Sequence, residues 1–207
     1  MQSNNEQRSE NWKIERYGKF SASEIIKLLG VRGLGETGKT YAIEKAIEEL
    51  YGEMEENFVS FDMQRGIELE PLAFAKFKEL KELEFLEVTN CSFFKFNEDA
   101  GASPDGLVSD DAVLEIKCPK STTFFELVAT NEVDKKYYAQ MQMQMLCTNR
   151  NKTYFFNYLI HEGTEYHHEI IVERDDVMIE LIKTRLNEAI EIKKEYINKI
   201  NTNKQWK

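Results

Sequence analysis

The chain has 207 residues, of which 42% are hydrophobic, enough for the core of one domain, and no apolar run reaches the roughly 18 residues of a membrane span. The net charge of −10 argues against a protein that coats DNA with a uniformly basic surface. The three scattered cysteines are too few for a four-cysteine iron–sulfur cluster, and no signal peptide is evident, so we expect reduced thiols in a cytoplasmic protein.

The first predicted element is a short helix near the N-terminus. Ser21 and Glu24 have the spacing of a capping box, and Gly30 fits the position just past the helix end. The free N–H groups at the start of this helix, together with Arg16 and Ser23, form a candidate anion site. The alternative is a capped helix beside an arginine that has no binding role.

A glycine-rich segment and two longer helices follow. Residues 33–40 match the P-loop pattern G-x4-G-K-T, which needs a strand directly before it and a helix directly after it. Because the preceding segment is predicted to be helical, we favour a mobile, glycine-rich connection over a nucleotide-binding P-loop. Apolar periodicity predicts amphipathic helices over about 40–51 and 60–83.

The second of these helices carries a candidate metal ligand. Glu70 lies in an apolar-lined stretch beside Pro71, which marks either a helix start or a kink. Glu68 is its competitor for the same role. A glutamate that favours the first turn of a helix through the helix dipole fits the spacing equally well.

The middle of the chain predicts short strands over 85–88, 92–96, 106–108 and 113–118. In the last strand apolar and charged residues alternate, which places Glu115 and Lys117 on one face, about 7 Å apart. A Pro-Asp-Gly turn upstream can bring Asp105 to the same face. Two carboxylates and an amine then converge, which suits a divalent metal, a water and a phosphate. The alternative is a hairpin with these charges on its solvent face.

The C-terminal half predicts helices over 122–129, 135–147 and 175–200, and a hairpin that pairs 153–160 with 166–172. In the second of these helices Gln142 lies among apolar neighbours, whereas Gln140 and Gln144 share the opposite side. A buried amide needs partners, so Gln142 either belongs to a core network or faces the site. With no internal repeat or linker, we predict one α/β domain over 12–200, a disordered stretch at 1–11 and a flexible tail at 201–207.

Asp105, Glu115 and Lys117 form the pattern Asp-(x)9-Glu-x-Lys, which resembles the PD-(D/E)xK nuclease motif. Five ordered pieces carry the likeness further: Arg16-Tyr-Gly-x-x-Ser-Ala-Ser-Glu24, Gly66-x-x-x-Glu70, Ser103-Pro-Asp-Gly-Leu107, Leu114-Glu-Ile-Lys-Cys-Pro119 and Tyr138-Ala-Gln-x-Gln142. Together they resemble the phage-type alkaline exonucleases, the lambda-exonuclease or YqaJ-like viral recombinase family. The resemblance implies an α/β fold with a PD-(D/E)xK restriction-endonuclease-like core, a central mixed β-sheet flanked by helices.

The resemblance also implies a metal centre. Glu70, Asp105 and Glu115 would hold two Mg²⁺ ions, which Mn²⁺ can replace, with help from the backbone carbonyl of Ile116. Lys117 would act on the nucleophilic water.

Further residues match other functional positions of the family. Gln142 matches the active-site glutamine, with Gln140 close by and in reach of the DNA. Arg16, Ser23 and Ser103 match the pocket that grips a 5′-phosphate.

The implied function is a Mg²⁺-dependent 5′-to-3′ exonuclease. It would act on double-stranded DNA ends and leave 3′ single-stranded overhangs for phage-type recombination by single-strand annealing. The implied partners are a single-strand annealing protein and two further copies in a homotrimer, in the cytoplasm of a bacterial host that carries the phage or prophage. The alternatives are another PD-(D/E)xK DNA repair nuclease, an endonuclease or one of different polarity, and a P-loop nucleotide-binding protein. An acidic exterior around a local basic groove would reconcile the net charge with DNA binding.

Overall fold

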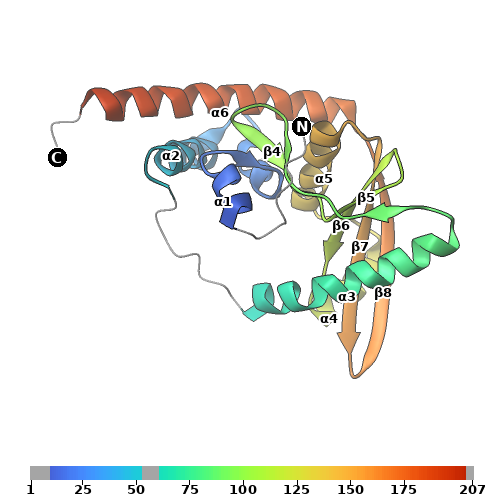
Figure 1. The fold of residues 1–207 in the computed structure, drawn as a ribbon. Coiled ribbons are helices and arrows are strands. Elements are labelled where there is room, and N and C mark those ends of the chain that lie inside the picture. Colours follow the sequence, from blue (N-terminus) through green and yellow to red (C-terminus); the bar gives the residue numbers. More distant parts are fainter. Residues whose placement is uncertain (1–9, 53–60, 204–207) are drawn as a thin grey trace.

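The structure, a computed structural model, describes residues 10–52 and 61–203 (Figure 1). The helices are α1 (Glu10–Arg16), the 3-10 helix η1 (Ala22–Leu28), α2 (Gly35–Tyr51), α3 (Phe61–Leu83), α4 (Ser121–Thr130), α5 (Lys135–Thr148) and α6 (Asp176–Thr202). The strands are β1 (Phe20–Ser21), β2 (Val88–Thr89), β3 (Phe94–Lys95), β4 (Ala100–Ala102), β5 (Gly106–Val108), β6 (Ala112–Lys117), β7 (Lys152–His161) and β8 (Thr164–Glu173).

A five-stranded mixed sheet, in the order β2-β5-β6-β7-β8, has the charged strand β6 at its centre. β6 pairs antiparallel with β5 and parallel with β7, which sets Glu115 beside Phe155. Five of the six residues of β6 are buried. The predicted mixed sheet flanked by helices is confirmed, and the alternative of a hairpin with Glu115 on a solvent face is wrong.

Helices cover both faces of this sheet. α3 packs Ala73 and Phe77 against Leu114 on one face, and α5 packs Met141 against Val113 on the other. Because successive strand residues point to opposite faces, Glu115 and Lys117 are directed toward α5. The sheet therefore presents its charged residues to one helix.

A second core surrounds the small sheet β1-β4-β3. It is formed by side chains of η1, α2, α5 and α6, with Phe20 and Ile25 at its centre and Leu186 from α6. Figure 1 shows α6 lying along one side of the molecule, over α2 and α5. Helix α5 thus lies between the two cores, and its residues 139–145 are all buried.

The predicted capping box at Ser21 is not formed. Ser21 belongs to β1, which pairs with β4, and its N–H donates to the hydroxyl of Tyr41 at 3.2 Å. In a capping box the side chain of Glu24 would accept a hydrogen bond from the Ser21 N–H, but this N–H already donates to Tyr41. The segment that follows is a 3-10 helix instead of an α-helix, and Gly30 directly follows its C-cap residue, as predicted.

The glycine-rich segment 33–40 is neither a P-loop nor a mobile connection. Helix α2 begins at Gly35, so most of the segment is helical, and η1 precedes it where a P-loop needs a strand. Gly38 is buried against Leu34, where an added Cβ would lie 2.9 Å from the Leu34 Cβ, and Lys39 is exposed. The P-loop interpretation therefore lacks the strand that it requires.

The ends of the domain differ slightly from the prediction. α1 already begins at Glu10 and α6 continues to Thr202, so part of each predicted disordered end is helical. The rest of those predictions, over 1–9 and 204–207, and residue 60 of the predicted helix 60–83 lie outside the described residues. No helix in the described part of the chain is both long and apolar enough to cross a membrane.

Candidate active site

The turn before β5 and the end of β6 bring Asp105 and Glu115 together with Lys117. The N–H of Ile116 donates to Oδ2 of Asp105 at 2.7 Å, and the N–H of Asp105 donates to the carbonyl of Leu114 at 3.0 Å. Lys117 Nζ donates to Oε1 of the buried Glu115 at 2.5 Å. The strand periodicity and the turn thus produce one cluster of two carboxyls and an amine.

Two carboxyl groups face one amine in this cluster. Burial raises the pKa of Asp105 well above its ordinary range, and the charges of Glu115 and Glu70 raise it further against the opposing effects of Lys117 and the N–H of Ile116. Burial alone would lower the pKa of Lys117, but the nearby carboxylates, above all Glu115, raise it. Lys117 is therefore held as an ammonium, and a further cation beside Asp105 would stabilise the charged form of that carboxyl.

Helix α5 supplies two amides to Glu115. Gln140 Nε2 donates to Oε1 at 2.7 Å, and Gln144 Nε2 donates to Oε2 at 2.5 Å. Gln144 was not predicted as a site residue. Its spacing of four residues from Gln140, which puts both on one helix face, is the sequence signal that identifies it.

Gln142 does not reach this carboxylate. Its Nε2 donates to the carbonyl of Glu173 at 2.9 Å, and its Oε1 accepts from the N–H of Asp175 at 2.8 Å, where the chain enters α6. Residues two positions apart lie about 200° apart around a helix, so Gln142 cannot share the face of Gln140. The core-network alternative is correct, and the assignment of Gln142 to the catalytic set is wrong.

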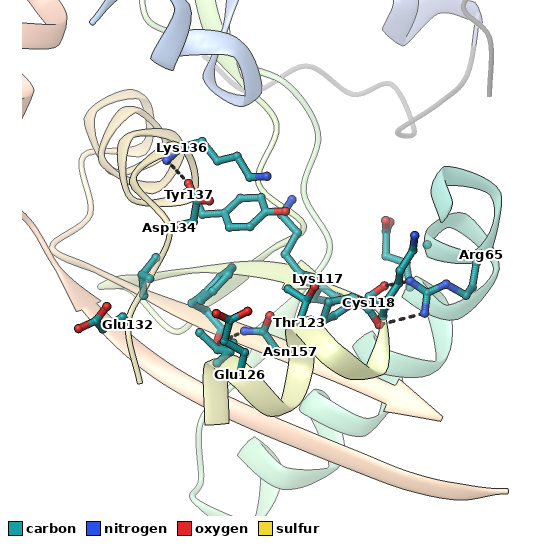
Figure 2. A pocket seen from close by; sticks show the side chains of 18 of the residues that line it. Arg65, Lys117, Cys118, Thr123, Glu126, Glu132, Asp134, Lys136, Tyr137 and Asn157 are labelled. Atoms are coloured by element: carbon teal, nitrogen blue, oxygen red, sulfur yellow. Dashed lines mark hydrogen bonds between the residues drawn. The ribbon is translucent and has the colours of Figure 1, made fainter. Parts of the chain in front are cut away.

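A groove of about 1140 Å³ opens beside Lys117, between the first half of α3 and the α4–α5 segment. Figure 2 shows Lys117 and Tyr137 pointing toward each other, and Lys117 Nζ lies 5.1 Å from the centre of the Tyr137 ring. The charged lining is mixed: Arg65, Lys117, Lys120, Lys135 and Lys136 beside Glu70, Glu126, Glu132 and Asp134. The expected basic groove is therefore not uniformly basic at this point.

Glu70 reaches the groove from α3. It is part of the groove lining, and its charge contributes to the raised pKa of Asp105. Earlier in α3, Arg65 donates to the carbonyl oxygens of Cys118 and Pro119 at 3.0 and 2.9 Å (Figure 2). Arg65 thus ties the first turns of α3 to the chain that leaves β6. No pattern in the sequence marked it for that role.

The cluster is not a preformed metal cage. Among the described residues, no three His, Cys, Asp or Glu side chains converge closely enough to hold a metal ion, so the expected trio of Glu70, Asp105 and Glu115 is not assembled. The donor chemistry nevertheless fits a hard divalent cation, because Asp105 and Glu115 offer neighbouring carboxyl oxygens whose charged forms a cation would stabilise. Magnesium is commonly held by one or two carboxylates, several waters and substrate phosphate, so two carboxylates suffice.

Two of the predicted phosphate-binding residues, Arg16 and Ser103, contact Trp12 of α1. Trp12 Nε1 donates to Oγ of Ser103 at 3.1 Å, and the guanidinium of Arg16 lies 4.1 Å from the centre of the Trp12 ring. Burial lowers the pKa of Arg16, although nearby groups that include Glu24 of η1 raise it. The exposed Ser23 directly precedes Glu24 in the sequence. An anion beside Arg16 would offset the cost of burying its charge.

A model of the YqaJ-like viral recombinase domain matches residues 11–151. The chain belongs to this family. An alkaline exonuclease (LHK-Exo) from Laribacter hongkongensis is 31% identical, with a TM-score of 0.82 over 94% of this chain and 97% of that chain. The same exonuclease in complex with dAMP matches with a TM-score of 0.80.

A phage-related exonuclease from Haemophilus somnus 129PT has the same fold, with 19% identity and a TM-score of 0.67 over 88% of this chain and 96% of that chain. Comparison with curated protein sequences gave no significant match. The predicted family and the PD-(D/E)xK fold class are confirmed.

Proposed function

We propose that this protein is a Mg²⁺-dependent exonuclease that degrades duplex DNA from its 5′ ends and leaves 3′ single-stranded overhangs for recombination by single-strand annealing. Its family and its similarity to an alkaline exonuclease support a nuclease that serves recombination. The observation that carries the proposal is the cluster of Asp105, the buried Glu115 and Lys117, whose lysine lines a groove at the end of a central strand.

Asp105 and Glu115 are the residues that would hold Mg²⁺ or Mn²⁺, with the carbonyl of Ile116 as a further ligand. Glu70, which lines the adjacent groove, would complete a two-ion site only by moving closer to them. A bound ion of this kind lowers the pKa of a coordinated water and stabilises charge on the scissile phosphate. The cluster supports this assignment because burial and the charges of Glu115 and Glu70 raise the pKa of Asp105, and a bound cation would offset both effects.

Lys117 acts in this proposal as a donor of hydrogen bonds. Neighbouring carboxylates raise its pKa, so at neutral pH it carries a proton and cannot accept one. At the groove its ammonium can orient the attacking water or stabilise charge on the phosphate oxygens. Gln140 holds Glu115 in place through Oε1, and Tyr137 lines the groove beside the lysine.

Arg16, Ser23 and Ser103 are the proposed binding site for the 5′-phosphate. Burial lowers the pKa of Arg16, and an anionic ligand there would stabilise its charged form. Ser103 lies in the same β4–β5 connection as Asp105, so this site and the carboxylate cluster share one short segment of chain. On the basis of the family resemblance, we extend the proposal to a homotrimer and to a single-strand annealing protein as partner in the host cytoplasm.

Digestion of linear duplex DNA labelled at either end tests the function. With Mg²⁺, the wild-type protein should release a 5′ label at once and a 3′ label late, should prefer a 5′-phosphate to a 5′-hydroxyl, and should stop when EDTA is added. Prior release of the 3′ label, or cleavage of covalently closed circles, would identify a nuclease of the opposite polarity or an endonuclease. Intact DNA under all conditions would contradict the proposal.

A further inference from the structure

The side-chain amide of Gln144 is buried, and only its NH₂ group has a hydrogen-bond partner in the described part of the chain. Its Nε2 donates to Oε2 of Glu115 at 2.5 Å, whereas its Oε1 is buried without a hydrogen-bond partner in the described part of the chain. The amide cannot turn around, because an ionised carboxylate accepts hydrogen bonds and so requires the NH₂ group to face it. The carbonyl is left unpaired as a direct consequence of the bond to Glu115.

An unpaired buried carbonyl destabilises the fold, and an apolar residue would avoid it. Met143 and Met145, unbranched and about as long as glutamine, occupy the neighbouring buried positions of α5. A methionine at position 144 would therefore fill the space without an unpaired oxygen. The hydrogen bond to Glu115 therefore explains why this position holds a glutamine and not a methionine.

The bond controls an oxygen that the other donors leave untouched. Lys117 and Gln140 both donate to Oε1 of Glu115, and Gln144 donates to Oε2. The terminal torsion of a glutamate is broad, so donors to one oxygen leave the carboxylate free to turn. Gln140 and Gln144 project from successive turns of one helix, and together they fix the carboxylate plane.

We propose that Gln144 is a positioning residue that sets the plane of the Glu115 carboxylate for binding a divalent ion. This inference rests on the proposed function, which makes Glu115 a metal ligand. Three donors occupy three of about four lone-pair positions of the carboxylate, so its orientation decides where the remaining one points. Loss of a partner that orients a metal ligand typically weakens metal affinity or activity roughly 10–100-fold.

The test compares Gln144→Met with Gln142→Met, a matched change at a buried amide on the same helix that bonds to backbone away from Glu115. Mn²⁺ affinity is measured by electron paramagnetic resonance of the free ion, together with kcat and KM on 5′-phosphorylated duplex. Gln144→Met should weaken Mn²⁺ binding and lower kcat roughly 10–100-fold, with KM for DNA nearly unchanged. Gln142→Met should lower the melting temperature and leave Mn²⁺ affinity as it is.

Equal Mn²⁺ affinity in the two variants would overturn the inference. If Gln144→Met does not fold, Gln144→Asn, which withdraws the amide by one methylene, takes its place, and wild-type affinity in that variant would overturn the inference as well. A wild-type protein that binds Mn²⁺ but leaves DNA intact would contradict the proposed function, and the comparison of Mn²⁺ affinities would still decide the role of Gln144.

Discussion

Two lysines with carboxylate partners occupy opposite environments in this molecule. Lys193 of α6 has a side chain that is 1% exposed, and its partners Asp99 and Glu49 are 22% and 49% exposed. At the end of β6 the order is reversed, because the side chain of Glu115 is 2% exposed and that of Lys117 is 27% exposed. In one place the cation is buried and the anions reach water; in the other the anion is buried.

This difference separates a structural ion pair from the pair that we propose to be reactive. Around Lys193 the fold supplies two carboxylates and the carbonyl of Gly18, and water screens what charge remains. Around Glu115 and Asp105 two carboxyl groups lie close together and Glu115 is removed from water, so ionising both is costly unless a cation joins them. The burial of the acidic partner therefore distinguishes the candidate site from the ion pairs of Lys193, since an ion pair is present in both places.

Replacing each lysine by methionine, which keeps the length of the side chain, sharpens the comparison. We expect Lys117→Met to lower kcat roughly 10²–10³-fold, the effect of removing one preorganised donor from the transition state. Single-turnover digestion of 5′-phosphorylated duplex with Mg²⁺ measures the rate, and circular dichroism verifies the fold. Wild-type turnover in a folded Lys117→Met protein would remove this lysine from the chemistry.

Arg16 is a partly buried cation whose pKa is lowered by burial, whereas at β6 the buried group is a carboxylate. We expect Arg16→Ala to reduce the preference for a 5′-phosphate over a 5′-hydroxyl by about 1.5–3 kcal/mol, the value of a hydrogen bond to a charged group. The measurement is the ratio of digestion rates on the two substrates. The control is Lys13→Ala, a change at an exposed cation of the same helix. An identical ratio in Arg16→Ala and the wild type would exclude Arg16 from phosphate binding.

Lys193→Met should affect stability instead of chemistry. The change leaves the carbonyl of Gly18 without its lysine donor and breaks the bond to Asp99, so we expect a loss of about 1–3 kcal/mol in the free energy of unfolding. Urea denaturation measures it, and digestion per folded molecule should stay at the wild-type value. Lys194→Met, at an exposed neighbour paired with Glu191, should change the stability by less than about 0.5 kcal/mol. An equal loss of unfolding free energy in Lys193→Met and Lys194→Met would show that the buried lysine stabilises the fold no more than its exposed neighbour.

The sequence predicts the strand side of the site because that signal is local. A period of two along β6 places Glu115 and Lys117 on one face whatever packs against it, and a Pro-Asp-Gly turn sets Asp105 before the strand. The helix side is different. α5 is buried on all sides between two cores, so no polar stripe shows which of its amides points to the sheet. The choice among Gln140, Gln142 and Gln144 depends on tertiary packing.

The same limit explains the error at Ser21. Its spacing from Glu24 fits a capping box, but the N–H in question bonds to Tyr41, which comes from another helix. Ser21 also pairs with β4, a strand far along the chain. Local patterns fail where a partner distant in sequence takes the same hydrogen-bonding group. In the motif at β6, by contrast, the bond of Asp105 is to the nearby backbone of Ile116.

An exposed lysine completes the comparison and should show the smallest effect. Lys39 lies in the P-loop-like segment and pairs with Glu36 on the solvent face of α2. Because water screens both charges, we expect Lys39→Ala to change the free energy of unfolding by less than about 0.5 kcal/mol. Digestion of duplex DNA should proceed at the same rate in the variant and the wild type, with or without ATP. If ATP bound the wild type and not Lys39→Ala, an exposed lysine would be carrying a function, and burial would no longer separate the lysines that matter from those that do not.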